Sequence, residues 1–221
     1  MKISLIVFTL NEIDGMRAIM PRIKKEWYDE LIIVDGGSID GTIEYAKEHG
    51  YNIFVQKGRD TGAAFWESFE KVTGDTIIIF CPDGNSIPEK IPEMVEKYKE
   101  GYDMVTVSRY LDGAKSYDDD WITAFGNRMF TGIINCLFNA RVTDALGIYR
   151  IFNKQIIYKL NIDTYTPSWG TQILLRAIKR GLKIAEIPGD EPKRIGGKRK
   201  MRPVKNGFYE LKMIISEGLI P

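Results

Sequence analysis

The chain has 221 residues, of which 44% are hydrophobic, and a formal net charge of +1. This length fits one domain with a full core, and the balanced charge excludes a general nucleic-acid binder, whose surface would be strongly basic. The two cysteines, Cys81 and Cys136, have neither CxxC spacing nor a histidine nearby, so they indicate neither a zinc site nor a disulfide scaffold. A reducing, cytoplasmic setting is the default for such a chain.

The first residues, "MKISLIVFTLNE", are basic and then apolar. The apolar run is too short for a secretory signal and lacks a small-residue cleavage site, so it predicts a first strand. No apolar run of about 18 residues follows, so the sequence predicts no membrane-spanning helix.

Short apolar runs alternate with helix-like patterns along the chain. Strands are predicted at Ile3–Phe8, Leu31–Val34, Tyr51–Val55, Thr76–Phe80, Met104–Val107, Leu146–Phe152 and Ile184–Ile187. Helices are predicted at Gly15–Trp27, Gly41–His49, Thr61–Val72, Pro88–Lys99, Ala124–Phe138 and Thr171–Arg180. Strands rich in Ile and Val that alternate with helices indicate an α/β fold, with a mostly parallel sheet covered on both faces.

In such sheets, ligands bind beside the carboxyl ends of the strands. Five stretches follow predicted strands there: "FTLNE", "VDGGSIDGT", "QKGRDTG", "FCPDGNS" and "SRYLDG". Four of them carry acids or glycines at the point where the strand ends. Turn and capping preferences explain any one of these on its own, but their coincidence favours a binding site.

The most specific motif is "IIVDGGSIDGT", in which Asp35 ends a buried strand and two glycines allow a close backbone approach. Neither GxGxxG nor GxxxxGK[ST] is present, so a dinucleotide fingerprint and a phosphate loop are both missing. With "TLNE", "CPDGN", "SRY", "DALGIYRIF" and "RIGGKRKM", the motif resembles the glycosyltransferase family 2 enzymes, in order and over essentially the whole chain. Within that family, the polyprenol-phosphate sugar synthases are the nearest in pattern.

The resemblance implies the GT-A fold in a single domain spanning residues 1–221. Residues 1–110 would bind the nucleotide sugar, residues 111–205 the acceptor, and residues 206–221 would form a C-terminal amphipathic segment. The donor would be a UDP- or GDP-sugar, bound by carboxylates that accept hydrogen bonds from the nucleoside and by nearby cations. The implied nucleotide-binding residues are Thr9, Asn11, Glu12, Asp35, Gly37, Lys57, Arg59 and Asp83.

In the family, the strand before Asp83 ends in D-x-D, and the acids bind Mg²⁺ or Mn²⁺ together with the donor diphosphate. Here the first acid is replaced by Cys81, while Asp83 and Asn85 remain. A hard cation takes one or two carboxylates plus phosphate and water oxygens, so Asp83 and Asn85 are the implied ligands. Cys81 is a soft ligand and is interpreted as a packing residue.

The acceptor half lacks the carboxylate that many relatives use as a general base, because Gln172 stands at that position. An amide cannot accept a proton at neutral pH, whereas a phosphate acceptor is already anionic and needs no base. A polyprenyl phosphate is therefore the preferred acceptor and the transfer would invert the anomeric carbon. The implied acceptor or phosphate ligands are Arg109, Arg150, Trp169, Gln172, Arg194 and Lys198, with Asp83, Arg109 and Arg150 as catalytic residues.

The segment Lys193–Lys205 contains seven basic residues and no acid. By resemblance it is a loop that closes over phosphates and meets an anionic membrane surface. The last segment places Phe208, Leu211, Ile214 and Ile215 on one helical face, which could lie on lipid, pack on the core or meet a second subunit. The predicted location is the cytoplasm, with peripheral attachment to the membrane directly or through a membrane-anchored partner. Whether the chain forms a homo-oligomer is left open.

Three alternatives remain open at the level of the sequence. A transferase acting on a sugar hydroxyl would need a base, for which Asp144 and Asp163 are the candidates. A sugar nucleotidyltransferase would share the general fold, but the Gly-rich, Arg-containing N-terminal loop that cradles a triphosphate is absent. A non-catalytic nucleotide-sugar-binding protein is the third, because the first metal acid is missing.

Overall fold

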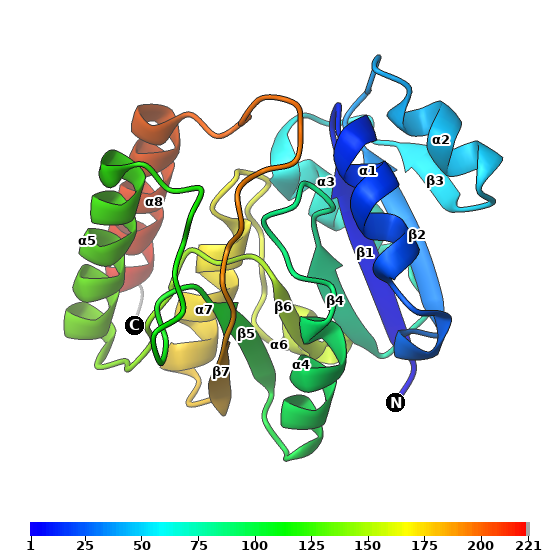
Figure 1. Ribbon diagram of the computed structural model, residues 1–221. Coiled ribbons are helices and arrows are strands. Elements are labelled where there is room, and N and C mark those ends of the chain that lie inside the picture. Colours follow the sequence, from blue (N-terminus) through cyan, green and yellow to red (C-terminus); the bar gives the residue numbers. More distant parts are fainter. Residues whose placement is uncertain (220–221) are drawn as a thin grey trace.

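The computed structural model describes residues 1–219; the last two residues of the predicted segment 206–221 lie outside the described residues. A seven-stranded sheet is formed by β1 (Ile3–Thr9), β2 (Glu30–Asp35), β3 (Asn52–Val55), β4 (Thr76–Phe80), β5 (Met104–Ser108), β6 (Arg150–Asn153) and β7 (Ile184–Pro188). The strand order is β3-β2-β1-β4-β6-β5-β7, and β6 alone among these strands runs antiparallel to its neighbours. The prediction of a mostly parallel α/β sheet is confirmed (Figure 1).

The helices are α1 (Ile13–Ile19), α2 (Thr42–Glu48), α3 (Asp60–Phe69), α4 (Lys90–Lys99), α5 (Trp121–Phe138), α6 (Lys154–Lys159), α7 (Trp169–Lys179) and α8 (Pro203–Leu219). Two 3₁₀ turns, η1 (Met20–Arg22) and η2 (Lys25–Trp27), occupy the second half of the helix predicted over Gly15–Trp27. That helix prediction was too long, because Pro21 has no N–H for a helical hydrogen bond and lies at the start of η1 instead.

The strands are buried on both faces, and successive side chains of each strand enter two different cores. On one face Phe8, Ile79 and Phe152 pack with side chains of α3, α5, α7 and α8. On the other, Val7 and Phe80 pack with side chains of α1, α2 and α4. This period-2 division explains why the strands read as continuous apolar runs.

Because six strands are parallel, their carboxyl ends lie along one edge of the sheet, here called the rim. The loops that follow β1, β2, β4, β5 and β7 all start at the rim. The antiparallel β6 contributes its preceding loop, residues 144–149, to the same edge. From β7 the chain crosses the rim before it reaches α8 (orange in Figure 1); we call residues 190–200 of this crossing the strap.

Candidate active site

The loop after β2 is organised around Asp35. One carboxylate oxygen accepts hydrogen bonds from the hydroxyls of Thr9 (2.7 Å) and Ser38 (2.6 Å), and the other from the backbone N–H groups of Gly37 (2.8 Å) and Ser38 (2.6 Å). A carboxylate offers about four acceptor sites, so Asp35 uses all of them within its own loop and on Thr9 of β1. This geometry favours a structural role for Asp35, which differs from the nucleoside contact expected from the sequence.

Asn11 and Glu12 follow β1 at the rim. Asn11 links this loop to the next, since its Oδ1 accepts from the backbone N–H of Ile39 at 2.9 Å. Glu12 is 7% exposed, and its N–H donates to the hydroxyl of Thr42 at 2.9 Å. The Glu12 carboxylate therefore has a fixed backbone beneath it and faces the strap.

Asp83 lies in the loop after β4, where its Oδ1 accepts from the Asn85 N–H at 3.1 Å. The loop is pressed against α1: a Cβ added to Gly15 would lie 2.1 Å from the Pro82 carbonyl oxygen. Burial raises the pKa of Asp83 to about 6, although the guanidinium of Arg194 opposes the shift. Burial likewise raises the pKa of the Cys81 thiol well above its ordinary value, which keeps it protonated and fits the packing role expected for it.

The strap places two cations over these acids. Arg194 donates from Nη1 to both oxygens of Glu12 (2.7 and 2.8 Å) and from Nη2 to Oδ2 of Asp83 (2.6 Å). Lys200 donates to Oε1 of Glu12 at 2.5 Å and to the Asn11 carbonyl at 3.1 Å. The strap is also tied to the β4 loop through its backbone, since the N–H of Ile195 donates to the Asp83 carbonyl at 2.8 Å. Glu12 and Asp83, from the ends of β1 and β4, are thus joined by one guanidinium.

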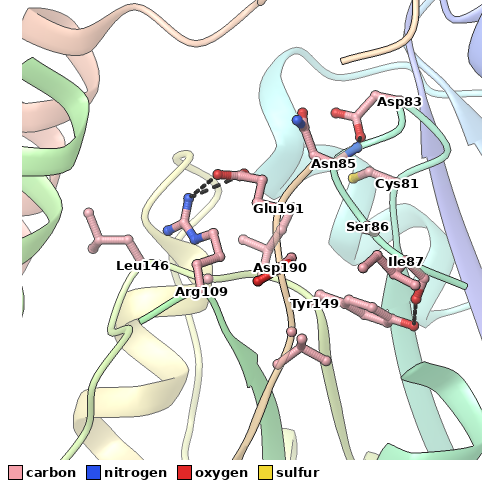
Figure 2. A pocket seen from close by; sticks show the side chains of 14 residues that line it. Cys81, Asp83, Asn85, Ser86, Ile87, Arg109, Leu146, Tyr149, Asp190 and Glu191 are labelled. Carbon is pink, nitrogen blue, oxygen red and sulfur yellow. Dashed lines mark hydrogen bonds and ion pairs between the residues drawn. The ribbon is translucent and has the colours of Figure 1, made fainter. Parts of the chain in front are cut away.

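A cavity of ≈ 170 Å³ lies beside this cluster. Its lining includes Cys81, Asp83, Asn85, Arg109, Gly147 and Glu191 (Figure 2). Arg109 forms a fork with the buried Asp144, at 2.7 Å from Nε and 2.9 Å from Nη2, and donates to Glu191 at 3.3 Å. Burial alone would raise the pKa of Asp144, but Arg109 holds it below its ordinary value.

Glu191 was missed by the sequence reading. Burial raises its pKa, opposed chiefly by Arg109, and its carboxylate also accepts a short hydrogen bond from the hydroxyl of Ser116. The signal was available: Asp190 and Glu191 follow β7 after a single glycine, and the rule that ligands bind beyond the carboxyl ends of strands applies to β7 as to the others.

Two residues expected at the acceptor site, Arg150 and Trp169, are buried away from the cavity. Arg150 is 1% exposed and donates to the carbonyls of Gly170 and Ala145. Trp169 is fully buried and stacks on Phe65 with ring centroids 4.3 Å apart. In this structure the contacts of both side chains are structural, because Arg150 binds backbone carbonyls at α7 and before β6, and Trp169 packs against α3.

Gln172 is also buried, 3% exposed. Its amide donates to Asp163 at 2.7 Å and to Glu217 of α8 at 3.1 Å, and its Oε1 accepts from the backbone of Asp163 and Thr164. Gln172 therefore joins α7 to α8. The remaining expected ligands, Lys57, Arg59 and Lys198, are exposed.

The three consecutive acids Asp118–Asp120 are not all exposed. The Asp119 side chain is 1% exposed and accepts from Arg199 of the strap at 2.8 Å. It also lies 3.8 Å from Arg109. The strap is thus paired with acids of two separate regions, with Glu12 and Asp83 at the rim and with Asp119 before α5.

Comparison with known proteins agrees with this architecture. The sequence profile of glycosyl transferase family 2 matches residues 4–160. The chain therefore belongs to glycosyl transferase family 2 and is a glycosyltransferase that uses a nucleotide sugar.

Two archaeal proteins and one solved structure illustrate the relationship. Glycosyltransferase AglJ of Haloferax volcanii is 26% identical over 211 residues, which is 92% of this chain and 68% of AglJ. The uncharacterised protein MJ1222 of Methanocaldococcus jannaschii is 30% identical over 196 residues, which is 85% of this chain and 80% of MJ1222. The fold is that of glucosyl-3-phosphoglycerate synthase from Mycobacterium tuberculosis, solved with Mn²⁺, UDP-glucose and phosphoglyceric acid (TM-score 0.75, 20% identity, 100% of this chain and 80% of that one). These relatives support the family and the GT-A fold, and they do not single out the polyprenol-phosphate sugar synthases.

Proposed function

We propose that the protein transfers a sugar from a UDP-sugar to a polyprenyl phosphate at the cytoplasmic side of a membrane, with inversion at the anomeric carbon. The observation that carries this proposal is the pair of carboxylates, Glu12 and Asp83, that meet at the rim under the cations of the strap. A GDP-sugar would satisfy the same groups. The proposed attachment to the membrane is peripheral. Among residues 1–219, no helix is long and apolar enough to cross a membrane.

A divalent cation fits this site only together with the donor. The described residues contain no cluster of three or more His, Cys, Asp or Glu side chains that could hold an ion alone. Asp83 presents a buried carboxylate whose Oδ2 is held by Arg194, and Asn85 donates from its amide nitrogen to the Pro192 carbonyl, which leaves its amide oxygen available. Asp83 and Asn85 would therefore hold Mg²⁺ or Mn²⁺ with diphosphate and water oxygens completing the shell. When bound, the cation would neutralise charge on the departing diphosphate.

The protein's own cations supply the rest of the electrostatics. Two anions, the donor diphosphate and the acceptor phosphate, must approach each other. Arg194 and Lys200 would bind the donor diphosphate, and Arg109, which lines the cavity, the acceptor phosphate. An acceptor phosphate oxygen then forms a bond to the anomeric carbon, while the bond from that carbon to the diphosphate oxygen breaks and its electron pair leaves with the nucleoside diphosphate.

Glu191 supports a second candidate, transfer to a sugar hydroxyl. It lines the cavity and burial raises its pKa, which suits a general base near neutral pH. Asp144, considered from the sequence, is buried under Arg109. Asp163, the other candidate, is exposed and paired with Arg176. The hydroxyl-acceptor alternative therefore depends on Glu191 as the base.

The test supplies radiolabelled UDP- and GDP-sugars, with Mn²⁺, to the protein together with either a polyprenyl phosphate or free oligosaccharides. We expect a lipid-linked sugar with polyprenyl phosphate, little effect of Glu191→Gln, and loss of turnover in Asp83→Ala. Transfer to the oligosaccharide alone, abolished by Glu191→Gln, would replace the proposal with the second candidate. Unchanged turnover in Asp83→Ala would remove the metal assignment.

A further inference from the structure

The outer face of α8 is an apolar stripe. Val204, Phe208, Leu211, Ile215 and Leu219 follow one another at intervals of three or four residues, and all are exposed, Phe208 to 67%. Residues at these intervals share one side of a helix. Ile214, grouped with this stripe in the sequence reading, is instead fully buried and packs in the core. The stripe is therefore additional to the face that α8 needs for folding.

The neighbouring helix α5 also exposes apolar side chains. α5 lies next to α8 (Figure 1), and Trp121, Ile122, Phe125 and Met129 are exposed on it, Trp121 to 79%. We call these four residues, together with the five of the α8 stripe, the α5–α8 face. Scattered exposed apolar residues are ordinary, but nine on two adjoining helices mark an interaction surface.

The exposed charged side chains of α5 and α8 are all basic. α5 contains no acid and one cation, the exposed Arg128. The two acids of α8, Glu210 and Glu217, turn toward the protein: Glu217 is 1% exposed and binds Arg176 of α7 at 2.7 Å, and burial raises the pKa of Glu210. The bases of α8, Lys205 and Lys212, are exposed.

We propose that the α5–α8 face docks on a bilayer that contains anionic lipid. This inference deepens the proposed function, because it gives the lipid-linked acceptor a surface on which to present its phosphate to the rim. Apolar side chains would enter the acyl boundary while Arg128, Lys205 and Lys212 meet anionic headgroups. Arg202 and Lys198, both exposed on the chain that leads into α8, add to the same charge.

A second copy of the chain suits this face less well than lipid. In a two-fold dimer the same surface appears on both subunits. Arg128, Lys205 and Lys212 would then lie near their own copies, with no exposed acid on either helix to compensate. An anionic bilayer provides the missing negative charge.

The test measures binding of the full chain to vesicles of phosphatidylcholine alone and with 30–50% phosphatidylglycerol, on the order used for peripheral proteins. We expect cosedimentation with the anionic vesicles, at least about tenfold weaker binding to neutral ones, and weaker binding at high salt. Trp121 reports insertion, since the other three tryptophans are half-buried or buried: its emission should shift to the blue, and Trp121→Phe should remove the shift.

Phe208→Asp places a charge in the stripe and should weaken vesicle binding about tenfold or more. Tyr158→Asp is the matched control, because Tyr158 is 58% exposed on α6, outside the α5–α8 face. Thermal stabilisation by UDP with Mn²⁺, measured on each variant, separates this inference from the proposed function. If Phe208→Asp loses vesicle binding but still binds nucleotide, the result supports docking through the α5–α8 face. If the unmodified chain does not bind nucleotide, the result contradicts the proposed function but not the docking surface. Undiminished vesicle binding by Phe208→Asp, no binding to anionic vesicles, or a dimer that shields Trp121 would overturn the inference.

Discussion

Arg194 binds Asp83 directly, with Nη2 of the guanidinium 2.6 Å from Oδ2 of the carboxylate. This ion pair holds the acid that the proposed function assigns to a divalent cation, so a cation and Arg194 compete for the same oxygen.

Replacing Arg194 by Ala should therefore have opposite effects on two ligands. Mn²⁺ alone should bind more tightly, because Asp83 loses its guanidinium partner. The nucleotide sugar should bind more weakly, on the order of 10- to 100-fold, because a charge-assisted hydrogen bond to phosphate is lost. Calorimetric titration with each ligand measures both. Lys193→Ala is the control, since Lys193 is exposed on the same strap; parallel weakening of both ligands in Arg194→Ala would contradict the competition.

Asp83 should make the folded protein less stable as the pH rises. Its pKa is raised by burial from 3.8 to about 6, so between these values the folded state binds more protons than the unfolded state and the free energy of unfolding falls with pH. Above about pH 6 the full penalty applies, on the order of 3 kcal/mol.

Asp83→Asn removes this titration and keeps the shape of the side chain. We expect the variant to be more stable than the unmodified protein at pH 7.5, and the difference to shrink toward pH 4. Urea unfolding at both pH values measures it, and because only the difference between the two proteins is used, other titrating groups cancel. A stability difference that is the same at both pH values would show that burial of the Asp83 charge is not its cause.

The Arg109–Asp144 pair should matter far more for stability than an exposed pair of the same type. Asp144 has a fully buried side chain, and Arg109→Met would leave its charge without a partner at a cost of about 3–5 kcal/mol. Arg22 and Glu89 form a similar fork, but their side chains are 46% and 52% exposed, so Arg22→Met should cost less than about 1 kcal/mol. Chemical denaturation compares the two variants; equal losses would contradict the assignment.

The loop after β4 packs closely against α1 at Gly15, where there is no room for a side chain. A Cβ there would meet the Pro82 carbonyl oxygen at 2.1 Å, so Gly15→Ala should displace the loop that carries Asp83. We expect nucleotide with Mn²⁺ to bind tenfold or more weakly, which corresponds to about 1.4 kcal/mol of binding free energy. Gly126 is also helical, but a Cβ there meets nothing within 4 Å. Gly126→Ala should therefore stabilise the protein by about 0.5–1 kcal/mol and leave binding unchanged. Thermal melts with and without ligand measure both, and identical behaviour of the two alanine variants would exclude the clash.

The sequence could predict the rim because its signals are local. A strand buried on both faces leaves a continuous apolar run, and the acids Glu12, Asp35 and Asp83 follow such runs directly. The sequence pattern could not predict on which face of the sheet a polar side chain lies. Arg150 was expected to bind phosphate, but at its position in β6 the side chain lies on the face covered by α7, where it donates to Gly170.

Long-range pairing was equally invisible. Asp119 resembles a solvated acid in a run of three, yet Arg109 and Arg199 reach it from segments on either side of it in the sequence. Trp169 resembles a sugar-stacking aromatic, yet it stacks on Phe65, more than a hundred residues earlier. In each case a partner distant in sequence decides whether the side chain is exposed.

The antiparallel strand β6 has a mechanical consequence. It is hydrogen-bonded to β4, which carries the Asp83 loop, and to β5, which carries Arg109. The Asp83 loop and Arg109 therefore follow strands of one continuous ladder and cannot separate about a hinge without breaking it. If the site closes around its substrates, we expect the movement in the loops beyond the carboxyl ends of the strands, because the sheet beneath them is one hydrogen-bonded unit.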